Sequence, residues 1–153
     1  MNPFEQAARN AATTQELATA SAAVVQRRLE IVQAALADPL RADHVELGRM
    51  GAEKVEALAA SAGAACVGAL DLADRSARAA LRESAEAEAH LARLARTGGG
   101  LDTVVEQTNW ALGVWSRALA TSWTLGGALL KSQAETLAPI HAAATANARR
   151  LRR

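Results

Sequence analysis

The sequence predicts an all-α fold of long amphipathic helices, arranged as a helical hairpin or a three-helix bundle with coiled-coil-like packing. Three observations predict it. About 40 of the 153 residues are alanine, the residue that loses the least side-chain entropy in a helix. Strand-forming residues are scarce and do not alternate with polar ones. Chain breakers are gathered mainly at Asp38-Pro39-Leu40 and at Gly98-Gly99-Gly100.

The first predicted helix covers about residues 15–37, and residues 1–12 either extend it or fray. Its apolar residues, called here the heptad stripe, are spaced by four, three, four, three and four: Ala18, Ala22, Val25, Leu29, Val32 and Leu36. This spacing is typical of a coiled-coil seam, so we expect the heptad stripe to be a packing face of this helix.

The second predicted helix covers about residues 43–96, roughly 80 Å if it is straight at 1.5 Å per residue. Asp43 and Glu46 have the spacing of an N-terminal capping box. Gly63 and Gly68 allow a close helix approach or a local bend. The apolar positions, called here the alanine line, are Val55, Ala59, Ala62, Cys66, Ala69, Ala73, Ala80, Leu91 and Leu94, with Cys66 expected to be a small buried residue.

The third predicted helix covers about residues 102–148, with a second capping box at Thr103 and Glu106 and a kink at Pro139. Four arginines among residues 149–153 place positive charge at its C-terminal end, where it favours the helix dipole. The three helices are expected to form a single domain over residues 1–153.

Composition and charge exclude several classes of function. The formal net charge of +1 gives no strong indication of nucleic-acid binding, and we expect no specific nucleic-acid partner. A single cysteine fits a reducing compartment, and the N-terminus lacks a signal-peptide pattern. A cytoplasmic protein is therefore expected. No apolar run of transmembrane length is free of charge, so we expect no transmembrane span.

The motifs that carry enzyme chemistry are missing from the sequence. There is no glycine-rich phosphate loop and no nucleophile elbow. The best metal-like pair is Glu86 and His90, one helical turn apart, but a di-iron bundle would require Glu-x-x-His motifs that the chain lacks. We read this pair, with Glu83 and Glu88, as part of a solvated polar face. The prediction is a protein without catalytic residues, cofactor or metal.

The segment Trp110–Leu130 is the most informative part of the chain, since it holds all three tryptophans and a single charge, Arg117. Four of its residues, called here the tryptophan stripe, are spaced by three, four and four: Leu112, Trp115, Leu119 and Trp123. Trp110, Val114, Leu125 and Leu129 widen it. Three interpretations stay open: a core against the other helices, contact with an external apolar surface, or a membrane span, which Arg117 makes costly.

Several stretches resemble the phasins, small proteins on the surface of polyhydroxyalkanoate granules. They are Val24-Val25-Gln26-Arg27-Arg28-Leu29 before Asp38-Pro39, then Met50-Gly51-Ala52-Glu53-Lys54-Val55-Glu56-Ala57, and finally Leu137-Ala138-Pro139-Ile140-His141 with Ala146-Asn147-Ala148-Arg149-Arg150-Leu151. Together with the helical segments between them they cover most of the chain. The chain departs from the family pattern in having one phenylalanine, Phe4, so tryptophan must supply the aromatic surface contact.

The resemblance implies a non-enzymatic coat at the surface of cytoplasmic storage granules, which limits granule coalescence and controls granule size and number. Its implied partners are the polyester surface and granule proteins such as a synthase or depolymerase. We expect the polyester contact at Trp110, Leu112, Val114, Trp115, Leu119, Trp123 and Leu129. Without granules, self-association into a dimer or tetramer would cover the apolar faces. A coiled-coil adaptor and a peripheral membrane-binding protein stay as alternatives.

Overall fold

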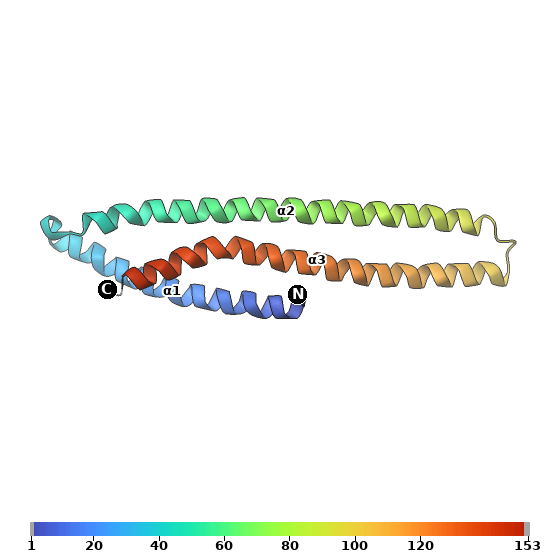
Figure 1. The fold of residues 1–153 in the computed structure, drawn as a ribbon, viewed down its shortest axis with the longest axis horizontal. Helices are drawn as coiled ribbons and strands as arrows, with labels where there is room; N and C mark the ends of the chain where they lie inside the picture. Colours follow the sequence, from blue (N-terminus) through green and yellow to red (C-terminus); the bar gives the residue numbers. More distant parts are fainter. Residues whose placement is uncertain (1, 152–153) are drawn as a thin grey trace. The chain divides into compact units, whose positions relative to one another are not determined.

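A computed structural model of the chain describes residues 2–151, apart from the side chains of Arg41 and Met50. No strand occurs in this part of the chain. Its elements are the helix α1 (Pro3–Ala37), the short 3-10 helix η1 (Pro39–Arg41), and the helices α2 (His44–Leu94) and α3 (Leu101–Arg150) (Figure 1). The all-α fold predicted from the sequence is therefore confirmed.

Helix α1 includes most of the N-terminal segment that the sequence left as either helical or frayed. Asn2 caps it by accepting a hydrogen bond from the Phe4 backbone N–H at 3.0 Å. Pro3 occupies the first turn, where its missing N–H costs no helical hydrogen bond. The helix ends at Ala37, just ahead of Pro39, as the helix-breaking property of proline predicts.

The capping box predicted at the start of α2 is only half formed. The Asp43 carboxylate accepts a hydrogen bond from the Glu46 backbone N–H at 2.9 Å, as predicted. The Glu46 side chain, however, accepts a hydrogen bond from Arg150 at 2.9 Å rather than serving the cap. The second box, predicted at Thr103, is wrong because α3 already begins at Leu101.

The turn before α3 depends on two glycines. Gly99 and Gly100 have φ angles of 88° and 74°, in the left-handed region that side chains with a Cβ rarely adopt. The predicted break at this position is therefore present. At the other end, α3 continues through Pro139 to Arg150, and its ribbon bends in the red-orange part, in the region of the predicted kink (Figure 1).

Contacts divide the chain into two compact units, which are described separately. Unit 1 comprises Met1–Gly68 and Leu130–Arg153, so it contains α1, the first part of α2 and the last part of α3. Unit 2 comprises Ala69–Leu129 and is a helical hairpin made from the rest of α2 and α3. The assignment of a single domain to residues 1–153 stays a prediction.

The helices of unit 1 meet largely through polar and small side chains. Asn10 of α1 donates hydrogen bonds to the Leu130 carbonyl at 2.8 Å and to Gln133 Oε1 at 3.0 Å, both on α3. Gln6 supports this contact by donating to Asn10 Oδ1 at 2.8 Å. Over the described residues, the buried hydrophobic ones are Val24 and Ala148, while the buried polar ones in this unit are Gln6, Asn10, Glu46 and Ser61.

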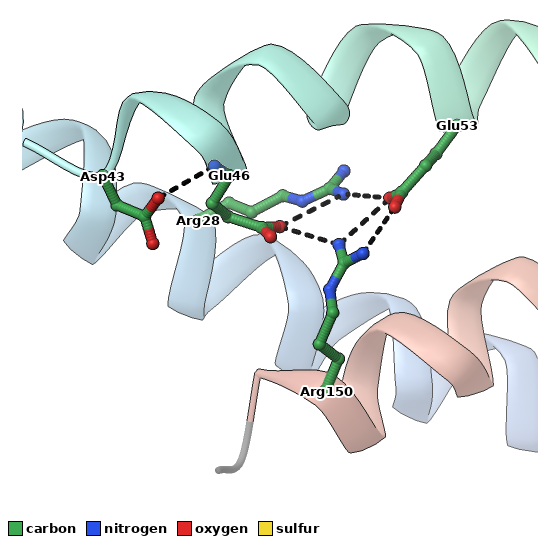
Figure 2. A network of polar contacts seen from close by, with 5 residues as sticks. All are labelled: Arg28, Asp43, Glu46, Glu53 and Arg150. Atoms are coloured by element: carbon green, nitrogen blue, oxygen red, sulfur yellow. Dashed lines mark hydrogen bonds and ion pairs between the residues drawn. The ribbon is translucent and has the colours of Figure 1, made fainter.

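Four charged side chains join the three helices of unit 1 (Figure 2). Arg150 of α3 donates two hydrogen bonds to the Glu53 carboxylate, at 2.6 and 3.2 Å, and one to Glu46. Arg28 of α1 donates to Glu53 at 3.2 Å and lies 4.0 Å from Glu46. The hydrogen bond from Arg150 holds the pKa of Glu53 below its usual value, and the same pair raises the pKa of Arg150. The two positive and two negative charges of the cluster compensate one another.

A close approach between α2 and α3 in unit 1 requires glycine at residue 68. A Cβ atom there would lie 2.7 Å from the Ser132 Cβ and would overlap the Ser132 hydroxyl. At Gly63, by contrast, no atom lies within 4 Å of the place that a Cβ would take. Of the two glycines that the sequence associated with close packing, Gly68 is therefore the one that serves it.

The heptad stripe, which the sequence predicts to be a coiled-coil seam, does not face the other helices of unit 1. The inward positions of α1 fall one residue earlier, with Val24 buried and Ile31 half-buried. One residue turns the face of a helix by about 100°, so the heptad stripe lies on the flank of α1. Its four large members are exposed: Val25 at 57%, Leu29 at 57%, Val32 at 38% and Leu36 at 79%.

The alanine line of α2 is likewise exposed, apart from Leu94, which is half-buried. Cys66, predicted to be a small buried residue, is exposed. Ser61, Gly68 and His90 take the inward positions instead. The prediction was wrong because the close approach at Gly68 and the contacts of His90 with Glu106 and Trp110 turn a different side of α2 toward its neighbours.

Candidate apolar surface-binding site

The tryptophan stripe lies in unit 2 and is exposed along its whole length. Because α3 is a continuous helix here, the spacing of three, four and four places its members on one face. Arg117 faces α2, and at about 100° per residue the stripe lies on roughly the opposite side of α3. The exposed fractions are 64% for Leu112, 70% for Trp115, 66% for Leu119 and 55% for Trp123.

Trp110, predicted to belong to the contact surface, is instead half-buried against α2. Its indole stacks on the imidazole of His90, with ring centroids 4.5 Å apart and an angle of 10° between the planes. His90 is only 4% exposed, so its expected place on a solvated polar face is wrong. Val114 and Leu125, which were also expected to widen the stripe, are half-buried as well.

His90 also belongs to a group of polar side chains, with Arg93 and Glu106, that links the two helices of unit 2. Glu106 Oε1 accepts a hydrogen bond from Arg93 Nε at 2.6 Å and lies 3.2 Å from His90 Nδ1. The hydrogen bond from Arg93, followed by the one from His90, lowers the pKa of Glu106. Glu106 therefore serves the hairpin rather than the capping box in which the sequence had placed it.

Arg117, the single charge in Trp110–Leu130, faces α2 and not the stripe. Its guanidinium donates to both oxygens of Glu83, at 2.8 and 3.2 Å, and this pair raises the pKa of Arg117. Glu83 is consequently half-buried, whereas Glu86 and Glu88 are exposed as predicted. None of the residues of the tryptophan stripe is charged, and the nearby Arg117 points toward α2.

Two further apolar residues continue the stripe toward the start of α3. Leu101 is 83% exposed and Val105 is 57% exposed, and they precede Leu112 at the same helical period with Thr108 between them. The same spacing is present in the sequence, but both residues lie outside Trp110–Leu130 and were not predicted to belong to the contact surface. Leu129, a predicted contact residue, is 57% exposed but lies about a quarter turn from the stripe.

Charged side chains occupy other sides of the same hairpin. Arg75 forms an ion pair with Asp71 at 2.8 Å, and Arg78 forms one with Asp74 at 2.9 Å, each one helical turn apart on α2. All four are exposed. Unit 2 thus presents the tryptophan stripe on α3 and these ion pairs on α2, where Leu70, Leu81 and Leu91 are also exposed.

Between residues 2 and 151, no group of three or more His, Cys, Asp or Glu side chains is placed to hold a metal ion. Helix α2 contains a window long and apolar enough to cross a membrane, judged by length and composition alone. This window does not lie in Trp110–Leu130, the segment for which a membrane span was one of the three interpretations.

Comparisons of the chain with protein-family models, with curated proteins and with solved structures found no match. The exposed tryptophan stripe and the sequence resemblance are therefore the two observations that bear on function.

Proposed function

We propose that this chain is a non-catalytic, phasin-like coat protein that adsorbs to the polyester surface of cytoplasmic polyhydroxyalkanoate granules. The observation that carries the proposal is the tryptophan stripe: two tryptophans and two leucines, each more than half exposed, on a face from which Arg117 is turned away. Leu101 and Val105 extend this contact face. Coating by such a protein limits coalescence and controls granule size and number.

The exposed stripe has a favourable free energy to gain from an apolar surface. Complete burial of a large apolar side chain contributes about 1.5–3 kcal/mol, so covering the exposed fractions of these four contributes roughly 6 kcal/mol before ordering costs. Leu101 and Val105 add to this. Tryptophan also suits a boundary between an apolar phase and water, because its indole combines a large apolar surface with one N–H donor.

A granule coat also needs a hydrated outer surface, and the ion pairs of α2 in unit 2 supply it. When the stripe lies on the polymer, the Arg75–Asp71 and Arg78–Asp74 pairs on α2 are available to water. Hydrated charges at the outer surface oppose the close contact of two coated particles. The same outer surface is where a synthase or depolymerase would meet the coat.

Two other functions predict different behaviour of the stripe. A coiled-coil adaptor would bury its tryptophans against a protein partner and would ignore polyester. A peripheral or inserted membrane protein would bind phospholipid vesicles, and the apolar window of α2 is the observation that favours it. The mostly exposed stripe favours an external apolar surface over the adaptor.

The test is cosedimentation of the purified full chain with amorphous polyhydroxybutyrate particles and, separately, with phospholipid vesicles. We expect binding to the particles that falls at least ten-fold in Trp115→Ser/Trp123→Ser. The matched control is Leu81→Ser/Leu91→Ser, which removes two exposed leucines from α2 (71% and 65%) and should bind like the original chain. Absence of particle binding would contradict the proposal, and binding to vesicles alone would replace it with the membrane alternative.

A further inference from the structure

The heptad stripe of α1 is an apolar face in unit 1 that surface adsorption through α3 does not use. Its spacing of four, three, four, three and four is that of a seam between two helices, not merely of an apolar side. The inward face of α1 is already occupied by contacts such as Asn10 with Gln133. The stripe is therefore available to a helix from outside the chain.

The order of residue sizes along the stripe indicates what that helix is. The spacing of the stripe is the same in both chain directions. When two copies of α1 cross antiparallel at residue 27, every stripe residue of one copy therefore lies opposite a stripe residue of the other. Each alanine of the stripe then meets a larger residue, and the central layers join a valine to a leucine. The layers are Ala18 with Leu36, Ala22 with Val32, and Val25 with Leu29 of the second copy. Parallel pairing would instead put alanine on alanine at one end and leucine on leucine at the other.

We propose that the heptad stripe is the self-association face of this protein, and that its occupant is α1 of a second copy packed antiparallel. This inference concerns a different helix and a different ligand from the granule contact and does not depend on it. A two-fold contact of this kind closes on itself and yields a dimer.

The residues on either side of the stripe are compatible with an antiparallel dimer. In the antiparallel register Gln26 meets Gln26 of the second copy, and Thr19 meets its Gln33, so both flanking pairs are polar and uncharged. The exception is Arg28, which approaches its own counterpart. Its charge is compensated within the chain by Glu53 at 3.2 Å, and its side chain is only 20% exposed.

An open groove beside the stripe gives the second helix further contact. It lies in unit 1, has a volume of about 250 Å³, and is lined on α1 by Val24 and Val25 and on the neighbouring helices by Leu58 and Ile140. Leu58 is 51% exposed at its edge. A helix lying along the stripe would cover these apolar side chains together.

The expected interface is modest in size. The stripe runs from Ala18 to Leu36, about 27 Å along the helix axis, and a contact of this length lies near the lower limit of about 1,200 Å² for specific interfaces. We therefore expect a dimer that forms reversibly with rising protein concentration.

Sedimentation velocity of the full chain over a concentration series tests the face. We expect the original chain to pass from monomer to dimer, and Val25→Glu/Leu29→Glu to stay monomeric while its helical circular dichroism is unchanged, since both side chains are exposed in the single chain. The control Ala12→Glu/Ala34→Glu adds the same charge at exposed α1 positions away from the stripe and should dimerise normally. A Val25→Glu/Leu29→Glu protein with the original mass would overturn the proposal, as would an original chain that is monomeric at every concentration.

A charge exchange tests the orientation. In the antiparallel layer, Val25→Glu/Leu29→Lys places each new glutamate opposite a lysine of the second copy, so dimerisation should recover relative to Val25→Glu/Leu29→Glu. Parallel pairing would set glutamate against glutamate, and a variant that stays monomeric would overturn the antiparallel arrangement. Particle binding separates the two proposals, because Val25→Glu/Leu29→Glu should still bind polyester, whereas Trp115→Ser/Trp123→Ser should still dimerise.

Discussion

The indole of Trp110 stacks on the imidazole of His90 at a centroid distance of 4.5 Å. This contact distinguishes Trp110 from Trp115 and Trp123, which are exposed. Trp110 belongs to the packing of the hairpin in unit 2. Trp115 and Trp123 belong to its exposed face. Trp110 therefore stabilises the hairpin, whereas Trp115 and Trp123 are available for surface contact, and substitutions should affect stability at the first and binding at the other two.

Trp110→Ala should destabilise the protein far more than Trp115→Ala. Loss of the half-buried indole removes its stack on His90 and leaves a gap between two helices, which we expect to lower the free energy of unfolding by about 2–3 kcal/mol. Trp115 is 70% exposed, and its replacement should change that free energy by about 0.5 kcal/mol or less. Urea denaturation followed by circular dichroism measures both, and equal effects would contradict the different placement of the two residues.

Much of the fold could be predicted from the sequence because the relevant signals are local. Alanine content predicts helices, and Pro39 and the glycines at 98–100 predict where they end. The N-cap at Asp43 was also predicted, since a capping side chain and its backbone partner are neighbours in the chain.

The direction in which each helix faces could not be predicted in the same way. Periodicity identifies the apolar side of a helix but not the helix that packs against it, and in unit 1 the helices meet largely through polar and small side chains. Val25 and Cys66 lie on apolar lines yet are exposed, whereas Asn10 and His90 are buried. Their partners are distant in sequence: Gln133 lies against Asn10, and Trp110 lies against His90. Such pairs become visible only when the helices are placed together.

Fluorescence quenching should separate the tryptophans without any ligand. A variant that retains Trp115 alone should be quenched by acrylamide several-fold more strongly than one that retains Trp110 alone, because the indole of Trp115 is exposed and that of Trp110 is covered on one face by His90. Phenylalanine in place of the other two tryptophans preserves most of the apolar area. Similar quenching constants would argue that the hairpin of unit 2 is open in solution.

Replacement of two glycines by alanine should have opposite effects. Gly68→Ala forces a Cβ into the side chain of Ser132 and should lower the free energy of unfolding by about 1–3 kcal/mol. The Cβ added by Gly63→Ala meets no neighbouring atom, so this substitution should raise the free energy of unfolding by up to about 1 kcal/mol, because alanine is the better helix former. In the Gly68→Ala background, Ser132→Gly should recover part of the loss. If both single variants were stabilising, α2 and α3 would not approach each other closely at this point.

The charged cluster of unit 1 predicts a loss of stability in acid. The pKa of Glu53 is lowered in the folded chain by Arg150, below an unfolded value of about 4.3. Its contribution is therefore fully present above the unfolded pKa and is lost as the pH falls through the folded pKa. Urea midpoints measured from pH 7 to pH 3 should fall, and Glu53→Gln should flatten this dependence while costing about 1–2 kcal/mol at pH 7. The control Glu56→Gln, at an exposed neighbouring position, should keep the original slope.

The most direct test of the account is a binding isotherm of the full chain on amorphous polyhydroxybutyrate particles, measured beside Trp115→Ser/Trp123→Ser and Leu81→Ser/Leu91→Ser. We expect saturable binding by the original chain and by the leucine variant, and at least ten-fold weaker binding by the tryptophan variant. Equal binding by all three proteins would contradict the assignment of the tryptophan stripe as the contact face. No binding by the original chain would contradict the coat function itself.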